Sequence, residues 1–404
     1  MGIGPTASWP RRLQALLPQN IWAWVSNYLK YVFNKKHPFA TYDGATDKGV
    51  YALGGDAAAA GAAAGAEAAA SAGAAAGAIR MSIAGDWASG TAESYRVAQQ
   101  MRAFNPHFTI HLGDVYYVGD ETAVKQEFLG EAVNRDQPIT WPRGSSGSFA
   151  LNGNHEMYAN GNAYFDEILP WLGMSTATAG AHAGQKASYF CLMNAWWAVI
   201  GIDTGYNSTG LPILNQIPLI NKIPGVGPSC KLEPPLLAWL GNEVAPRLGG
   251  RGIILLSHHQ YCSAFDDGIP LPARQMHACL PRPVLWYWGH EHRLAVYDRY
   301  AMRDGLAAFG RCIGQGGMPV EQGQKPRQGD ARALLWDDRV YETIDGSAVG
   351  FNGYANLTFE GNRLTVEHRD LTGSLLITER WHTDAGQLTL LELRRDNLQI
   401  SAAT

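Results

Sequence analysis

Short apolar runs that each end at a glycine or a polar residue recur between residues 79 and 288. They are rich in β-branched and aromatic side chains and short for helices, so we expect buried strands. The runs are Ile79–Ala84, Phe108–Leu112, Ser148–Asn152, Asn194–Ile202, Gly252–Leu256 and Pro283–Trp288. After the first run, Tyr95, Ala98 and Met101 repeat at helical spacing. Thr91 can cap that helix, which should run through Phe104. The alternation of strands and helices predicts an α/β fold.

After residue 350 the helical period fades, and further strand-like runs follow at regular spacing. They are Tyr354–Phe359, Arg363–Arg369, Leu375–Arg380 and Leu388–Leu393. Turn residues such as those at 360–362 separate them. We expect these strands to join a sheet of the same domain, which then covers residues 79–404. The Pro- and Gly-rich insert at 204–232 should be a surface loop near the functional face.

Two segments precede this domain. Residues 1–54 contain an aromatic-rich stretch that could form an amphipathic helix on a membrane surface or on a protein partner. The alternative is a helix packed against the outside of the main domain. Residues 55–78 are rich in Ala and Gly, and we expect a linker. That stretch is long enough to span a bilayer, but Ala and Gly favour insertion weakly, and Glu67 at mid-depth would cost about 2.5–3.5 kcal/mol.

Composition narrows the class of protein. Of the 404 residues, 46% are hydrophobic and 17% are charged, as in a globular chain. The net charge of −4, without a long basic block, argues against a nucleic-acid-binding surface. Five cysteines without Cys-x-x-Cys spacing suit a reducing compartment, although Cys262 and Cys279 could pair in an oxidising one. The N-terminus lacks the order of a secretory signal, so we expect a cytoplasmic protein.

Residue types that bind metals stand at the ends of five of the predicted strands. They are Asp86; Asp114 with Tyr117; Asn154 with His155; His258 with His259; and His290 with His292. Taken singly, each has an ordinary explanation, because a Gly-Asp pair is usually a turn and a lone histidine usually belongs to the core or the surface. Open α/β sheets, however, bind their ligands at the carboxyl ends of the strands. The recurrence therefore predicts a metal site.

The candidate ligands define the chemistry of that site. Oxygen and imidazole ligands without a thiolate suit Zn(II), Fe or Mn. One ion cannot bind all the candidate ligands and also keep a position open for substrate. The candidates are Asp86, Asp114, Tyr117, Asn154, His258, His290 and His292. They suffice for two ions that share one carboxylate. Two ions roughly 3.5–4 Å apart lower the pKa of a bridging water and stabilise a transferring phosphoryl group.

The ordered motifs resemble those of the calcineurin-like metallophosphoesterases. They are Gly-Asp at 85–86, Gly-Asp-x-x-Tyr at 113–117, Gly-Asn-His-Glu at 153–156, His258 after an apolar strand, and Gly-His-x-His at 289–292. Most members carry a histidine two residues after the first aspartate. Ala88 stands there in this chain, and a tyrosine at position 117 is the pattern of the purple acid phosphatase branch. The resemblance covers residues 79–370 and implies a four-layer α/β/β/α sandwich of two mixed sheets.

The same resemblance implies the role of each residue. The first metal, Fe(III), would be bound by Asp86, Tyr117 and His292. The second, Zn(II), Mn(II) or Fe(II), would be bound by Asn154, His258 and His290. Asp114 would bridge the two ions, and His155 would protonate the leaving group or stabilise its charge. Glu156 would orient its neighbours rather than bind metal.

The chain also departs from the purple acid phosphatases, and residues beside the motifs have expected roles of their own. Where those enzymes carry further substrate-binding histidines, this chain has Asp266 and Asp267. His259 could take over that catalytic role, and His277 is a more distant candidate. We expect Trp87 and Tyr116 to pack around the site and His111 to be buried scaffold. Arg293 could contact substrate, with a salt bridge as the alternative.

These residues predict an enzyme that hydrolyses a small phosphate ester by attack of a metal-bound hydroxide. An acid-phosphatase-like phosphomonoesterase is the first expectation. The alternatives are a phosphodiesterase, acting on a nucleotide or a phospholipid headgroup, and a non-catalytic member that only binds phosphate. We expect no nucleic-acid partner, and a peripheral membrane or protein contact could form through residues 1–54.

Overall fold

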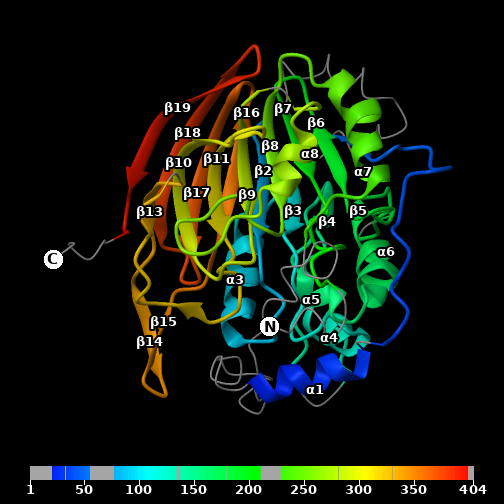
Figure 1. Ribbon diagram of the computed structural model, residues 1–404, viewed down its shortest axis with the longest axis vertical. Coiled ribbons are helices and arrows are strands. Elements are labelled where there is room, and N and C mark those ends of the chain that lie inside the picture. The colour runs from blue at the N-terminus through cyan, green and yellow to red at the C-terminus, as the bar shows by residue number, and fades with distance from the viewer. Residues whose placement is uncertain are drawn as a thin grey trace.

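Two eight-stranded sheets pack face to face at the centre of the protein, as the ribbon of the computed structural model shows (Figure 1). The structure describes residues 21–31, 33–54, 77–133, 137–178, 180–210, 229–280, 282–329 and 331–398. The predicted linker at 55–78 and the predicted surface loop at 204–232 therefore lie largely outside the described residues.

The first sheet combines early and late strands of the chain. Its order is β19 (Gln387–Arg395), β18 (Leu375–Asp384), β17 (Arg363–Asp370), β16 (Gly353–Glu360), β2 (Ile79–Ala84), β3 (Phe108–His111), β4 (Gly147–Ala150) and β5 (Gly173–Met174). Strands β2, β3 and β4 run parallel. Strands β16 to β19 pair antiparallel, and β16 joins the sheet beside β2. The strands expected after residue 350 thus extend this sheet.

The second sheet is also mixed. Its order is β1 (Val50–Ala52), β6 (Phe190–Met193), β7 (Trp197–Gly201), β8 (Gly252–Ser257), β9 (Val284–Trp288), β11 (Ala307–Ile313), β10 (Leu294–Ala301) and β13 (Ala333–Trp336). Strands β7, β8, β9 and β11 run parallel. Three short strands form a separate sheet: β12 (Val320–Glu321), β15 (Ser347–Gly350) and β14 (Val340–Ile344).

Helices cover the outer faces of both sheets. On the first sheet lie α3 (Ala92–Ala103), α4 (Glu121–Glu127), η5 (Tyr164–Ile168) and α6 (Leu169–Trp171). On the second lie α7 (Pro234–Trp239), η8 (Leu240–Val244) and α8 (Leu271–Met276), with η9 (Ala245–Arg247) after η8. Because apolar clusters fill both outer interfaces and the space between the sheets, the central parallel strands read as continuous apolar runs. The predicted four-layer α/β/β/α sandwich of two mixed sheets is confirmed.

A buried ionic cluster joins the two sheets. Arg311, on β11 of the second sheet, donates from Nε to both carboxylate oxygens of Glu379 on β18 of the first sheet, at 2.8 and 2.9 Å. His368 on β17 places its Nε2 2.8 Å from Glu379 Oε1. All three side chains are buried. Charges in such a place must be paired, because an isolated buried ion is far less stable than a hydrated one.

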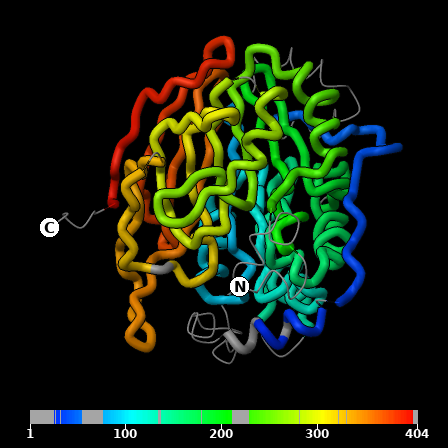
Figure 2. The backbone as a smooth tube through the Cα atoms, in the orientation of Figure 1, coloured from blue at the N-terminus to red at the C-terminus, as the bar shows by residue number. Residues whose placement is uncertain are grey.

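The segment before the linker packs against this sandwich. Strand β1 pairs with β6, and the Tyr42 hydroxyl donates to the carbonyl of Tyr189 at 2.7 Å. Helix α1 (Ile21–Tyr31) lies beside α4 and α5 (Asn154–Met157) in Figure 1, and the chain between α1 and β1 runs along the outside of the molecule (Figure 2). Tyr28 of α1 is buried. For residues 21–31, the structure therefore shows a helix packed against the outside of the main domain. Within the described residues, no helix is both long and apolar enough to cross a membrane.

The cysteines form no disulfide. All five lie within the described residues, and each of them is free. Cys279 is partly exposed and the other four are buried. The pairing of Cys262 with Cys279 is therefore absent from this structure.

Candidate metal centre

The carboxyl ends of parallel strands from both sheets bring the predicted ligands together. Asp86 follows β2, Asp114 follows β3, and His258 follows β8. One ligand atom of each of these three residues lies within 4.8 Å of the others. Asp86, Asp114 and His290 have positive φ angles of 57°, 74° and 64°. Such backbone conformations cost of the order of 1–3 kcal/mol each, so the surrounding contacts must stabilise them.

Glycines in the motifs let the ligand loops approach each other closely. A Cβ atom at Gly153 would lie 2.1 Å from Asp114 Oδ1, and one at Gly289 would lie 2.5 Å from Asp86 Oδ2. Any other residue at these positions would push a ligand carboxylate away. The motif glycines therefore act through close packing at the site.

A first group of atoms surrounds the hydroxyl of Tyr116. This hydroxyl lies 2.8 Å from Asp86 Oδ1, 3.2 Å from Asp114 Oδ2 and 3.0 Å from His292 Nε2. His292 Nε2 lies 3.5 Å from Asp86 Oδ1. Burial raises the pKa of Tyr116 well above its usual value, and the carboxylates of Asp86 and Asp114 raise it further. The phenol therefore stays protonated and donates to a carboxylate in the metal-free protein.

A second group of atoms surrounds His258. Its Nε2 lies 3.2 Å from Asp114 Oδ2 and 3.0 Å from Asn154 Oδ1, while its Nδ1 lies 2.9 Å from the carbonyl of Leu112. Asn154 Nδ2 donates to the hydroxyl of Tyr158 at 3.2 Å, which leaves its carbonyl oxygen directed at His258. Burial alone would lower the pKa of His258, but the nearby Asp114 raises it to about 9.

His290 adds a further imidazole to the second group. Its ring centroid lies 5.2 Å from that of His258 and 4.6 Å from that of His259. Ligand atoms of these three histidines all lie within 4.8 Å of one another. The backbone N–H of His290 also donates to Asp86 Oδ2 at 2.8 Å, which ties the second group to the first.

Asp114 belongs to both groups. Its Oδ1 accepts from the backbone N–H of His155 at 2.9 Å, which leaves Oδ2 facing Tyr116 and His258. Although burial alone would raise the pKa of this carboxyl, His258 and His155 hold it well below its usual range. Asp114 is therefore ionised, and one of its oxygens can be shared between two cations.

His155 and Glu156 follow Asn154 in the same loop. The ring of His155 is 17% exposed, its Nδ1 contacts the carbonyl of Tyr117, and its Nε2 lies 3.8 Å from Asp114 Oδ2. Glu156 is fully buried, and its Oε2 accepts from the backbone N–H groups of Asp114 and Gly153 at 3.1 and 3.0 Å. Burial and the charge of Asp114 raise the pKa of Glu156 to about 8. Glu156 therefore holds two ligand loops together.

His259 lies next to the second group. The hydroxyl of Thr204 accepts from the backbone N–H of His259 at 3.0 Å and lies 3.1 Å from its Nδ1. Burial lowers the pKa of His259 well below its usual value, and His290 lowers it further. His259 is therefore a neutral imidazole beside the candidate ligands.

Two other predicted residues lie in different surroundings. The Arg293 guanidinium stacks 4.2 Å from the ring centroid of Phe265, and its Nη2 donates to Gln324 Oε1 at 2.5 Å. The ring of Tyr117 packs against Val118 and Tyr28 in an apolar cluster. The structure therefore brings six of the predicted ligands together, and the phenol it adds to them is that of Tyr116. Sequence reasoning missed the contacts of Tyr116 with the candidate ligands, and it missed Tyr158 and Thr204; no spacing in the sequence singles these residues out.

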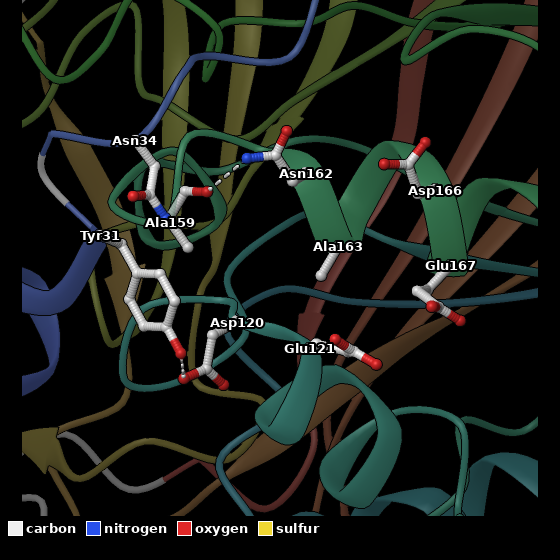
Figure 3. Close-up of a pocket in the computed structure, with 9 residues that line it drawn as sticks. All are labelled: Tyr31, Asn34, Asp120, Glu121, Ala159, Asn162, Ala163, Asp166 and Glu167. Atoms are coloured by element: carbon white, nitrogen blue, oxygen red, sulfur yellow. Dashed lines mark hydrogen bonds between the residues drawn. The ribbon is translucent and has the colours of Figure 1, made fainter.

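A separate pocket opens between α1, α4 and η5 (Figure 3). Its lining residues are Tyr31, Asn34, Asp120, Glu121, Ala159, Asn162, Ala163, Asp166 and Glu167. They include none of the predicted site residues. Four of them are carboxylates, which repel a phosphate anion. This pocket therefore does not suit a phosphate ester.

The spacing of the ligand atoms tests whether metal ions fit. Atoms that bind one ion at about 2.0–2.2 Å and at right angles lie about 3 Å apart. The contacts of Tyr116 with Asp86, Asp114 and His292 span 2.8–3.2 Å, and those of His258 with Asp114 and Asn154 span 3.0–3.2 Å. Both groups therefore have the spacing of ligands around one ion.

The family model for calcineurin-like phosphoesterases matches residues 79–294, which is more than half of the chain. The chain belongs to this family. The predicted superfamily is thereby confirmed, and all the ligand motifs of this calcineurin-like phosphoesterase lie inside the matched range. A search of curated proteins found no match.

Several solved structures resemble this calcineurin-like phosphoesterase at low identity. GAP50, the anchor in the inner membrane complex of Plasmodium, is 15% identical with a TM-score of 0.49, over 76% of this chain and 89% of GAP50. The purple acid phosphatase PPD1 from yellow lupin (Lupinus luteus) seeds is 12% identical with a TM-score of 0.46, over 75% of this chain and 53% of the lupin chain. PhoD is 12% identical with a TM-score of 0.46, over 79% of this chain and 72% of PhoD. Because these TM-scores lie below 0.5, the assignment depends on the family model.

Proposed function

We propose that this family member hydrolyses phosphate esters, with monoesters as the preferred class, at a centre of two metal ions. The observation that supports it best is the position of Asp114. Its Oδ2 lies 3.2 Å from Tyr116 in one group of ligand atoms and 3.2 Å from His258 in the other. The oxygen-rich first group suits Fe(III), and the imidazole and amide ligands of the second suit Zn(II), Mn(II) or Fe(II).

The ligand residues determine the net charge of the site to which the substrate binds. When bound, the two ions would supply Lewis acidity toward phosphoryl oxygens and lower the pKa of a nearby water. Asn154 is a neutral ligand of the second group, so the centre keeps positive charge that a phosphate can neutralise. The ionised Asp114 carboxylate contacts both groups through Oδ2, so it could bridge the two ions.

We assign the protonation of the leaving group to His155. Its Nδ1 is held by the carbonyl of Tyr117, so a proton for the leaving oxygen has to come from Nε2. Burial lowers the pKa of His155 in the free protein, and a bound phosphate anion would raise it again by its charge. His155 would therefore take up a proton with the substrate and release it as the bond between phosphorus and the leaving oxygen breaks.

We assign the orientation of the phosphate to His259. The hydroxyl of Thr204 already accepts from the backbone N–H of His259, so its own hydrogen can donate to Nδ1. The proton of the neutral imidazole then lies on Nε2. From there it can donate to a phosphoryl oxygen, which is the substrate-binding role expected of this residue.

Alanine substitutions at the second group test the proposal. We expect Asn154→Ala and His258→Ala to abolish hydrolysis of an aryl phosphate, because each removes a ligand atom that contacts the other. Metal content should be measured on the same samples. His277→Ala is the matched control, since His277 is exposed and does not belong to the groups of side chains that could hold a metal ion. Undiminished turnover in either ligand variant would refute the assignment, and bound metal without turnover in the parent protein would favour a non-catalytic phosphate-binding role.

The adjacent pair His258-His259 favours a second candidate function, a phosphodiesterase. A diester carries one negative charge fewer than a monoester dianion. A neutral N–H donor such as His259 therefore suits the binding of a diester better than a further cation does. A panel of aryl monoesters and diesters separates the two. Higher kcat/KM on monoesters, together with a loss of activity in His259→Ala, supports the first proposal; higher kcat/KM on diesters supports the second.

A further inference from the structure

We propose that the phenol of Tyr116 is the tyrosine ligand of the first metal ion, in the role that motif spacing gives to Tyr117. This inference rests on the two-metal centre proposed above and specifies one of its ligands. It also changes which tyrosine in the Gly-Asp-x-Tyr-Tyr sequence carries the chemistry.

The contacts of the Tyr116 hydroxyl carry the inference. It lies 2.8 Å from Asp86 Oδ1, 3.2 Å from Asp114 Oδ2 and 3.0 Å from His292 Nε2. These three atoms face the hydroxyl, whereas the other oxygens of Asp86 and Asp114 accept from backbone N–H groups of His290 and His155. One phenol oxygen thus stands at ligand spacing from three candidate ligand atoms at once.

Burial supports the same assignment. Tyr116 is fully buried, and its ring centroid lies 4.2 Å from that of His155. The two carboxylates beside this buried phenol carry negative charge that a bound cation can offset. A trivalent cation would do so, because Asp86, Asp114 and a Tyr116 phenolate supply three negative charges. On binding, the phenol would lose its proton to solvent as its oxygen bonds to the ion.

The side chain of Tyr117 lies in an apolar contact and not among the candidate ligands. It packs between two small apolar clusters, one with Tyr116 and Met318 and the other with Val118 and Tyr28 of helix α1. Its carbonyl contacts Nδ1 of His155. Tyr117 therefore contributes its backbone to the catalytic loop and its ring to the contact with α1.

The two adjacent tyrosines form a matched pair for the test. Metal-free wild type, Tyr116→Phe and Tyr117→Phe should each be titrated with Fe(III), and bound iron and the visible tyrosinate-to-iron absorption should be measured on each sample. We expect a coloured wild type, a coloured Tyr117→Phe and a colourless Tyr116→Phe, because only a phenolate bound to iron gives the band. Far-ultraviolet circular dichroism checks that each variant folds.

The outcomes separate this inference from the proposed function. Loss of the band in Tyr117→Phe with colour kept in Tyr116→Phe would overturn it while the metal centre stands. A colourless wild type with iron bound would also overturn it, since no tyrosine then binds the iron. A wild type that binds no metal would refute the proposed function itself. If Tyr116→Phe does not fold, Tyr117→Phe alone decides: an unchanged band supports Tyr116, and a lost band excludes it.

Discussion

At the scale of single residues, the two oxygens of each carboxylate in the site have different roles. Asp114 Oδ1 accepts from the backbone of His155, and Asp86 Oδ2 accepts from the backbone of His290. In each case one oxygen holds the loop that carries another ligand, and the other oxygen faces the ligand cluster. The site is therefore organised before any ion binds. Its polar groups can then stabilise a bound charge without having to change position first.

Residue types and their order predicted six candidate ligands that the structure brings together, because a short loop after a buried strand leaves little freedom for the residue at its start. The choice between Tyr116 and Tyr117 could not be made in that way. Both tyrosines follow Asp114 within three positions, and the backbone path of the loop decides which ring turns inward. Spacing carries no information about that path.

His111 is a buried residue that should make the stability of the folded protein depend on pH. Its ring lies among Trp87, Phe128 and Trp141, and within the described residues neither ring nitrogen has a hydrogen-bond partner. Burial lowers its pKa to about 3, whereas an unfolded histidine titrates near pH 6.5. Because the unfolded chain binds the proton first, we expect His111 to reduce the stability of the folded protein by about 1.4 kcal/mol per pH unit below pH 6.5, until about pH 3.

Replacing His111 with leucine should remove that loss. We expect His111→Leu to flatten the dependence of the unfolding free energy on pH between about 6 and 4, measured by urea denaturation. The exposed His277→Leu serves as the control and should leave the slope as in wild type. An unchanged slope in His111→Leu would show that this histidine does not titrate differently in the folded and unfolded states.

At the scale of elements, helix α1 contacts the loops of the candidate metal centre. Tyr28 packs edge-on against Tyr158 with ring centroids 5.6 Å apart, and the Tyr158 hydroxyl accepts from Asn154. The hydroxyl of Tyr31 donates to Asp120 Oδ2 at 2.9 Å. On its other side α1 exposes Leu29, and Phe33 just after the helix is exposed as well. A membrane or protein contact through residues 1–54 stays a proposal, and Leu29 and Phe33 are the apolar side chains that could make it.

The hydrogen bond from Asn154 to Tyr158 should strengthen the binding of the proposed second metal ion. Tyr158→Phe removes the acceptor that orients the Asn154 amide, and changes of this kind typically weaken metal binding by about 10–100-fold. We expect that loss for Zn(II) binding to the second group, measured by calorimetry on protein already loaded with iron. Tyr287→Phe is the control, because the buried hydroxyl of Tyr287 has no hydrogen-bond partner within the described residues. Equal Zn(II) affinity in wild type and Tyr158→Phe would contradict this role.

At the scale of the whole molecule, the sequence pattern predicted strands best where burial is continuous. Strand β9 is buried along its whole length, and the apolar and aromatic run that predicts it is unbroken. Strand β10 was not predicted, because its first half is buried and its second half is largely exposed. The pairing of β16 with β2 joins residues far apart in the chain, so local pattern could not predict it. Local pattern could not predict the position of α1 either, because that position depends on contacts with loops more than 80 residues away in the chain.

The buried cluster of Arg311, Glu379 and His368 joins the two sheets, so we expect it to affect the stability of the whole molecule. Burial alone would raise the pKa of Glu379, but Arg311 lowers it to about 2. Its carboxylate therefore stabilises the fold above about pH 4.5, and this stabilisation is lost as the pH falls toward 2. Glu379→Gln leaves the Arg311 charge buried without a counterion, so at pH 7 we expect a loss of about 3–5 kcal/mol in urea denaturation. Asp267→Asn removes the partner of Arg327 where both side chains are exposed and should change stability by less than about 1 kcal/mol. If the two variants lose equal stability, the ionic cluster does not hold the sheets together, and the apolar layer between them does so alone.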